Sequence, residues 1–123
     1  MRTSKLVAAA AALAVIALLG VFVIGLMIGS GVRDASTAAV AEFGGDRVQA
    51  LIAVVDSPTH SLAQRNRAVW ALGQLGDARA LPALERHRTG APCDHAHQIC
   101  QYEIDKAIRA CRGSTNLTAF LWR

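Results

Sequence analysis

The chain has 123 residues, of which 53% are hydrophobic, 5% aromatic and 18% charged. This composition excludes an intrinsically disordered chain, which would carry more charge and fewer apolar residues. The formal net charge of +4 is too small to favour nucleic acid as a partner. The length leaves room for one membrane span and one small soluble core, but not for two domains or a large enzyme cleft.

An uncharged, strongly apolar segment occupies residues 6–29. As a helix it would measure about 36 Å, slightly more than the roughly 30 Å hydrocarbon core of a bilayer. We therefore predict a single transmembrane helix that acts as an uncleaved signal anchor. A signal peptide cleaved after residues 39–41 is the alternative. Gly25 and Gly29 form a GxxxG pattern, which can bring two membrane helices together but also arises by chance in a span rich in small residues.

Positive charges around the span predict its orientation. Arg2 and Lys5 lie before it, whereas Arg33 follows it closely beside Asp34. This asymmetry favours a cytoplasmic N-terminus, residues 1–5, and a C-terminal module outside the cytoplasm. Because the composition is rich in alanine and arginine, we expect the inner membrane of a bacterium.

The remaining chain has the apolar period of helices and no sustained alternation typical of strands. Residues 30–45 form either a linker or a capping helix, and Gly44 with Gly45 interrupts them. Residues 46–113 form the soluble module, and residues 114–123 form a tail. Asp46 caps a first helix that ends near residue 56, and Ser61 opens a second helix that runs to residue 75.

A short third helix follows Gly76 and ends near His87. After a loop, Asp94 is expected to cap a long fourth helix that ends at Gly113. Its apolar face carries Cys100, Ile104, Ala107, Ile108 and Cys111. The fold class is therefore all-α.

The helices repeat in pairs. Val48 and Leu51 align with Leu81 and Leu84 at an offset of 33 residues, and the segment around residues 67–72 aligns with residues 106–111 at an offset of 39. A period of this length with two helices per unit is typical of an α-solenoid. Residues 67–84, RAVWALGQLGDARALPAL, resemble the HEAT-like repeat of the phycobilisome-lyase type.

The resemblance implies two stacked antiparallel helix pairs and a role in protein interaction or scaffolding. It also implies a turn fixed by Asp77 and Arg79, and a repeat core formed by Ala68, Leu72, Leu75, Leu81, Leu84, Ile104 and Ile108. None of these positions carries catalysis, so we expect no enzyme and no cofactor. A lyase-like role in chromophore attachment is the alternative from another class of function.

Two repeats are marginal, because each repeat buries its apolar face only against its neighbours. Support could come from a capping helix at residues 34–43, from the tail at residues 117–122, from self-association or from a disulfide.

Three cysteines are further candidates for a chemical role. Cys100 and Cys111 on one helix would lie about 16 Å apart, too far for a disulfide. We predict a disulfide between Cys93 and Cys100, with Cys111 as a buried free thiol. The alternative is a soft-metal or redox-sensing site formed by Cys93, His95, His97 and Cys100, although their spacing matches no closed zinc motif and we expect no bound metal.

Arginines make the repeat region locally basic. Arg65, Arg67, Arg86 and Arg88 form the predicted interaction surface, and a solvated helix face is the alternative interpretation of the same residues. The expected partner is a protein of unknown identity with an acidic surface. A homo-oligomer is a further alternative.

Overall fold

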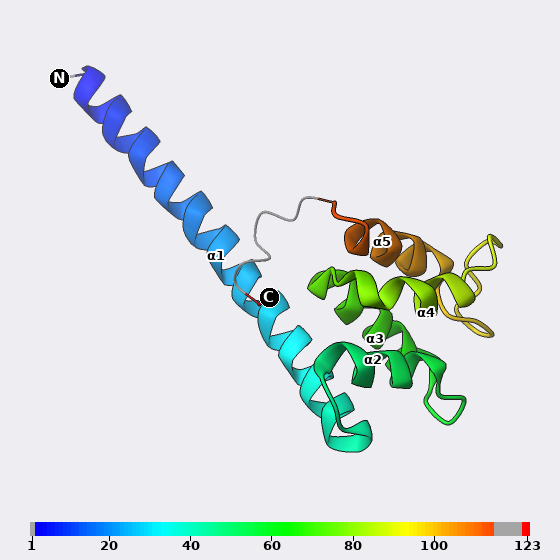
Figure 1. The fold of residues 1–123 in the computed structure, drawn as a ribbon. Helices are drawn as coiled ribbons and strands as arrows, with labels where there is room; N and C mark the ends of the chain where they lie inside the picture. Colours follow the sequence, from blue (N-terminus) through cyan, green and yellow to red (C-terminus); the bar gives the residue numbers. More distant parts are fainter. Residues whose placement is uncertain (1, 115–121) are drawn as a thin grey trace.

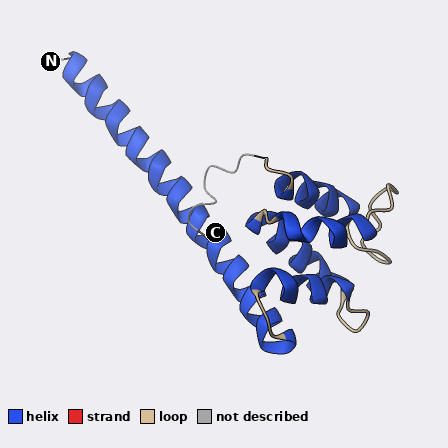
Figure 2. Cartoon of the chain, in the orientation of Figure 1, coloured by secondary structure: helices blue, strands red, loops and turns tan. Residues whose placement is uncertain are grey.

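The computed structural model describes residues 2–114 and 122–123 (Figure 1). The predicted all-α class is confirmed, and no strand occurs among the described residues (Figure 2). One long helix projects away from a cluster of shorter helices that packs against its C-terminal part. In chain order the elements are α1 (Arg2–Phe43), α2 (Arg47–Asp56), α3 (Leu62–Leu75), the 3₁₀ turn η1 (Ala78–Ala80), α4 (Leu81–Arg86) and α5 (Gln101–Cys111).

Helix α1 has 42 residues and is about 63 Å long, twice the thickness of a bilayer core. Its large apolar side chains between Leu6 and Met27 are 47–70% exposed. The stretch Thr3–Phe43 is long and apolar enough to cross a membrane, and a signal sequence shares these two properties. The first half of α1 is therefore the candidate membrane span.

The second half of α1 is part of the soluble module. Val32, Ser36 and Ala39 are buried against the shorter helices, at the i, i+4, i+7 spacing of one helix face. The Ser36 hydroxyl donates to the Val32 carbonyl at 2.7 Å, so its polar group is satisfied inside this contact. Residues 30–43 thus continue the helix without a flexible linker, and the chain turns at Gly44 and Gly45, whose φ angles are 72° and 75°.

The shorter helices form two stacked pairs, α2 with α3 and α4 with α5. Predicted capping groups set their boundaries. The Asp46 carboxylate accepts the Val48 N–H at 2.9 Å, and Ser61 with Gln64 forms a capping box at the start of α3. Gly76 ends α3 in the left-handed region at φ 62°. Local sequence therefore determines where these helices begin and end.

The core lies where α3 packs between α2 and α5, with α1 covering the open side of α2 and α3. A Cβ atom added at Gly73 would lie 3.0 Å from the Ala107 Cα, so α3 and α5 approach as closely as their backbones allow. Of the seven predicted core residues, Leu81 is partly buried and six are buried, namely Ala68, Leu72, Leu75, Leu84, Ile104 and Ile108.

Helix α5 begins six residues later than predicted. The Asp94 side chain accepts the Ala96 N–H at 3.1 Å, but it caps only a single turn. Tertiary hydrogen bonds hold the following residues out of the helix: Cys100 donates its N–H to Asn66 Oδ1 at 2.8 Å, and the Gln101 side chain accepts the Thr89 N–H at 2.7 Å. The helix therefore starts at Gln101, with Cys100 at its N-cap in an extended conformation.

The end of the tail also supports the module. Trp122 is only 5% exposed, and its indole N–H donates to the Gln74 carbonyl at 3.0 Å. Its Cβ would lie 3.5 Å from a Cβ atom added at Gly29. Gly25 and Gly29 are both buried, so a second helix on the Gly29 side of α1 would have to displace Trp122. Leu117, the other end of the predicted support, lies outside the described residues.

Candidate functional site

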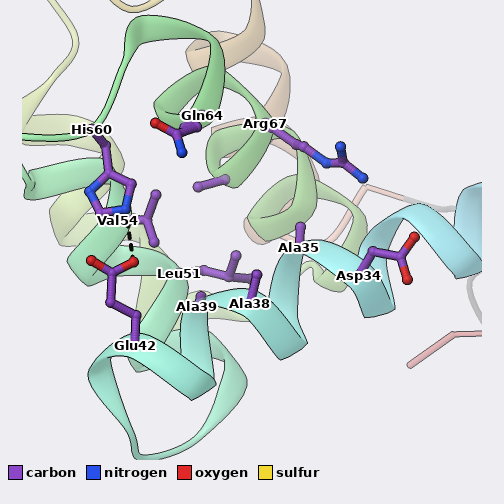
Figure 3. A pocket seen from close by; sticks show the side chains of 11 residues that line it. Asp34, Ala35, Ala38, Ala39, Glu42, Leu51, Val54, His60, Gln64 and Arg67 are labelled. Carbon is purple, nitrogen blue, oxygen red and sulfur yellow. Dashed lines mark hydrogen bonds and ion pairs between the residues drawn. The ribbon is translucent and has the colours of Figure 1, made fainter.

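A groove lies between α1 and α3, with α2 as part of its floor (Figure 3). We call it the α1–α3 groove; its volume is about 290 Å³. Small and apolar side chains line its floor: Ala35, Ala38, Ala39, Leu51, Val54 and Ala68. Polar groups stand on its rims, with Asp34 and Glu42 on α1 and Gln64 and Arg67 on α3. Such a groove can take an apolar side chain and orient its polar neighbours.

A hydrogen bond between His60 and Glu42 closes one end of this groove. The His60 Nε2 atom lies 3.0 Å from Glu42 Oε2, and its Nδ1 atom lies 2.9 Å from the Ser57 hydroxyl. The His60 ring also packs against Phe43, with ring centroids 5.8 Å apart. These contacts join the end of α1 to the loop between α2 and α3, so the groove is built on fixed elements.

Arg67 stands at the other end of the groove, near Asp34 (Figure 3). It is exposed, and within the described part of the chain no hydrogen bond or ion pair is recorded for its guanidinium group. An unpaired guanidinium beside an apolar floor is well placed to bind a carboxylate, because its planar fork of donors matches the two carboxylate oxygens.

The other predicted surface arginines have partners within the module. The Arg65 Nε atom donates to the Val55 carbonyl at 2.8 Å, which ties α3 to α2. Arg86 pairs with Asp56, and Arg88 pairs with Asp105, each at 2.7 Å. Exposed ion pairs of this kind contribute about 0–1 kcal/mol each.

The structure also places three of the four arginines in two separate hollows. Arg65 and Arg86 line a separate hollow of about 240 Å³ together with His97, whereas Arg67 lines the α1–α3 groove. The predicted surface is therefore not one uniform basic patch.

A second candidate site lies in the loop before α5. The Sγ atoms of Cys93 and Cys100 are 3.1 Å apart, and the Tyr102 N–H donates to Cys93 Sγ at 3.2 Å. The predicted disulfide is not supported, because an S–S bond measures about 2.05 Å and all three cysteines of the chain are free thiols. The two sulfurs nevertheless lie in contact with each other.

One of the two predicted histidines joins the thiol pair. Each potential ligand atom of Cys93, His95 and Cys100 lies within 4.8 Å of the others. His97 does not belong to this set, because its Nδ1 atom lies 2.9 Å from the Asp94 carboxylate. The predicted four-residue cluster is thus reduced to two sulfurs and one imidazole.

The three thiols differ in the direction of their pKa shifts. The hydrogen bond from the Cys100 thiol lowers the pKa of Cys93, and the backbone N–H of Tyr102 acts in the same direction. Burial raises the pKa of Cys100, and its contact with Cys93 adds to this effect. Burial also raises the pKa of Cys111 to about 11, and the thiol donates to the Leu72 carbonyl at 3.6 Å. Cys111 is therefore a core residue, separate from the pair.

Sequence reasoning offered a capping helix at residues 34–43 as one alternative, but it missed the groove that this segment lines and the role of Asn66. A signal for the first was present: Val32, Ser36 and Ala39 extend an apolar helical period beyond the span, as expected of a helix packed on one side. No local signal identifies Asn66, because its hydrogen bond to Cys100 joins residues 34 positions apart.

The fold places this chain among the small α-solenoids, which are stacks of antiparallel helix pairs. Residues 64–87 match the family model described as PBS lyase HEAT-like repeat, which confirms the predicted HEAT-like repeat over α3, η1 and α4. This match covers about a fifth of the chain. No curated protein and no solved structure matches the chain.

Proposed function

We propose that this chain is a membrane-tethered HEAT-like module that binds another protein and catalyses no reaction. The α1–α3 groove carries this proposal, because it combines an apolar floor with the unpaired guanidinium of Arg67. The HEAT-like repeat supports it, since repeats of this kind present surfaces for protein interaction. The modest net charge of +4 argues against nucleic acid as the partner.

The partner segment has a defined chemistry. It places one or two apolar side chains over Ala35 and Ala38 and a carboxylate against Arg67. Asp34 near Arg67 and Glu42 at the His60 end disfavour a strongly acidic segment, so we expect a mainly apolar segment whose single acidic residue lies directly against the Arg67 guanidinium. An ion pair formed there is shielded by the groove and gains more than a fully exposed pair.

We also propose that residues 6–29 anchor the module in the inner membrane of a bacterium, with residues 1–5 in the cytoplasm and the repeats outside it. The charge asymmetry around the span and the exposed apolar side chains of α1 support this arrangement. Reporter domains fused at each end, one active only in the cytoplasm and one active only outside it, test the orientation. The reverse pattern of activity would contradict it.

Site-specific cross-linking tests the partner. A photoreactive amino acid in place of Gln64, on the groove rim, should form an adduct with the partner in native membranes. Arg67→Glu should abolish this adduct because it places a carboxylate opposite the partner's acidic residue. Arg109→Glu is the matched control: Arg109 is an exposed arginine of α5, and its substitution changes the net charge equally.

The mass of the cross-linked adduct and its response to the two variants distinguish the possible occupants of the groove. An adduct of twice 13.0 kDa would identify a second copy of this chain as the occupant. An adduct that survives Arg67→Glu, or that Arg109→Glu removes as well, would contradict binding in the α1–α3 groove.

A further inference from the structure

We infer that Cys93, His95 and Cys100 form a binding site for one Zn²⁺ ion, with a fourth coordination position left to water. This assignment is independent of the α1–α3 groove and goes beyond the interaction function proposed above. The site rests on three side chains whose donor atoms the fold gathers within 4.8 Å of one another.

The loop geometry brings these ligands together. Residues 93–100 fold back through a turn around Asp94, and the Gln98 side chain donates to the Pro92 carbonyl at 3.0 Å across the base of the turn. Cys100 is held on α3 by its N–H bond to Asn66. Cys93 lies opposite it on the exposed side, where the Tyr102 N–H reaches its sulfur. One cysteine is thus fixed and buried, and the other is accessible.

The donor set fits zinc. Thiolate and imidazole ligands suit Zn²⁺, which binds sulfur at about 2.3 Å and nitrogen at about 2.0–2.1 Å. In a tetrahedral site these bond lengths place ligand atoms about 3.4–3.8 Å apart. The two sulfurs, now 3.1 Å apart, would separate by about 0.7 Å, and His95 would move inward. Both movements can be made by Cys93 and His95, which are exposed.

The charges and protons balance when Zn²⁺ binds. The two thiols release one proton each, His95 binds through a neutral ring nitrogen, and no electron is transferred. The complex joins residues 93–95 to Cys100 at the N-cap of α5. Zinc would therefore stabilise the module at the start of this helix.

Metal titration of the full chain in detergent tests this assignment. The chain is kept reduced with a phosphine under argon, and Zn²⁺ is titrated in competition with a chromophoric chelator. We expect one Zn²⁺ per chain, a saturable rise in thermal midpoint and, with Co²⁺ as a probe, a sulfur-to-cobalt charge-transfer band. Cys93→Ser and Cys100→Ser should each abolish the band, and His95→Ala should weaken zinc binding at least tenfold, because losing a direct ligand costs no less than losing an outer-shell partner.

Two matched controls share the neighbourhood but not the site. His97→Ala removes the histidine that is paired with Asp94, and Cys111→Ser removes the buried thiol; both should bind zinc as the unmodified chain does. Absence of a charge-transfer band, or unchanged affinity in His95→Ala, would overturn the assignment. So would conversion of Cys93 and Cys100 to a disulfide in a glutathione buffer that contains zinc.

Discussion

The close approach of α3 and α5 at Gly73 makes Gly73→Ala a sharp test of the stacked repeat. A Cβ atom at this position would lie 3.0 Å from the Ala107 Cα and 3.1 Å from the Ala107 Cβ. Both distances are shorter than ordinary van der Waals contact, and the nearer atom belongs to the backbone of α5. A side-chain rotation therefore cannot relieve the contact, and the two helices must move apart.

Two opposing effects set the change in unfolding free energy that Gly73→Ala causes. Alanine is favoured over glycine by up to about 1 kcal/mol in a helix interior, and by less here because Gly73 lies in the last turn of α3. Overpacking in a tight core costs about 1–3 kcal/mol. We expect a net loss of about 1–2 kcal/mol in the free energy of unfolding. For a module of this size each kcal/mol lowers the thermal midpoint by about 4–8 °C.

Urea unfolding of the full chain in detergent measures this loss, with the fluorescence of Trp70 and Trp122 as the signal. Gly20→Ala is the control, because nothing lies within 4 Å of a Cβ atom at Gly20. Adding Ala107→Gly to Gly73→Ala should restore part of the stability, since it removes one of the two close contacts. If Gly73→Ala is as stable as the unmodified chain or more stable, α3 and α5 do not approach as described.

Three further predictions concern the polar and buried groups of the module. Hydrogen bonds from Arg79 lower the pKa of Asp77 in the folded state. The Asp77 carboxylate therefore contributes stability above its unfolded pKa near 4, and this contribution is lost as the pH falls through its folded pKa. We expect Asp77→Asn to flatten the acid limb of a plot of unfolding free energy against pH. Because the pKa of Cys111 is about 11, only roughly one Cys111 thiol in a thousand is ionised at pH 8. A thiol reagent should therefore modify Cys93 readily and Cys111 only on unfolding. Equal modification rates for the two cysteines would contradict the burial of Cys111. Trp122→Ala should cost about 3 kcal/mol by urea unfolding, because it empties a buried aromatic position, and an unchanged midpoint would show that the tail does not support the repeats.

Where a helix boundary depends on its own residues, the sequence was sufficient to predict it. The carboxylate of Asp46, the Ser61–Gln64 capping box and the left-handed Gly76 all act within one turn of the boundary that they set. The period of the apolar residues likewise reflects local geometry, and it identified the helix pairs. The HEAT-like resemblance added the order in which these pairs stack.

The boundary of α5 depends instead on distant partners. Asp94 is a good capping residue, and the sequence after it has a helical period, yet Asn66 takes the N–H group of Cys100 from 34 residues away. The Gln101 side chain bonds the loop backbone at Thr89 and His87. Such bonds exist only in the assembled fold, so propensity alone predicted a helix that was too long. A local contact, in contrast, holds His97 outside the cysteine cluster, since its Nδ1 atom lies 2.9 Å from the Asp94 carboxylate.

In the proposed membrane-anchored arrangement, the continuity of α1 gives the α1–α3 groove a fixed height above the membrane. Asp34 lies five residues after the end of the predicted span and Glu42 lies thirteen after it, which correspond to about 8 Å and 20 Å along a helix axis. With Trp122 packed over Gly29 and Trp70 packed over Gly31, the module cannot swing freely about a flexible stalk. A partner must therefore present its segment within about 20 Å of the span's end, which favours a partner that is itself bound to the membrane. For such a partner the shared membrane would restrict diffusion and raise the effective concentration, so we expect a small groove with one arginine to be sufficient for the proposed binding.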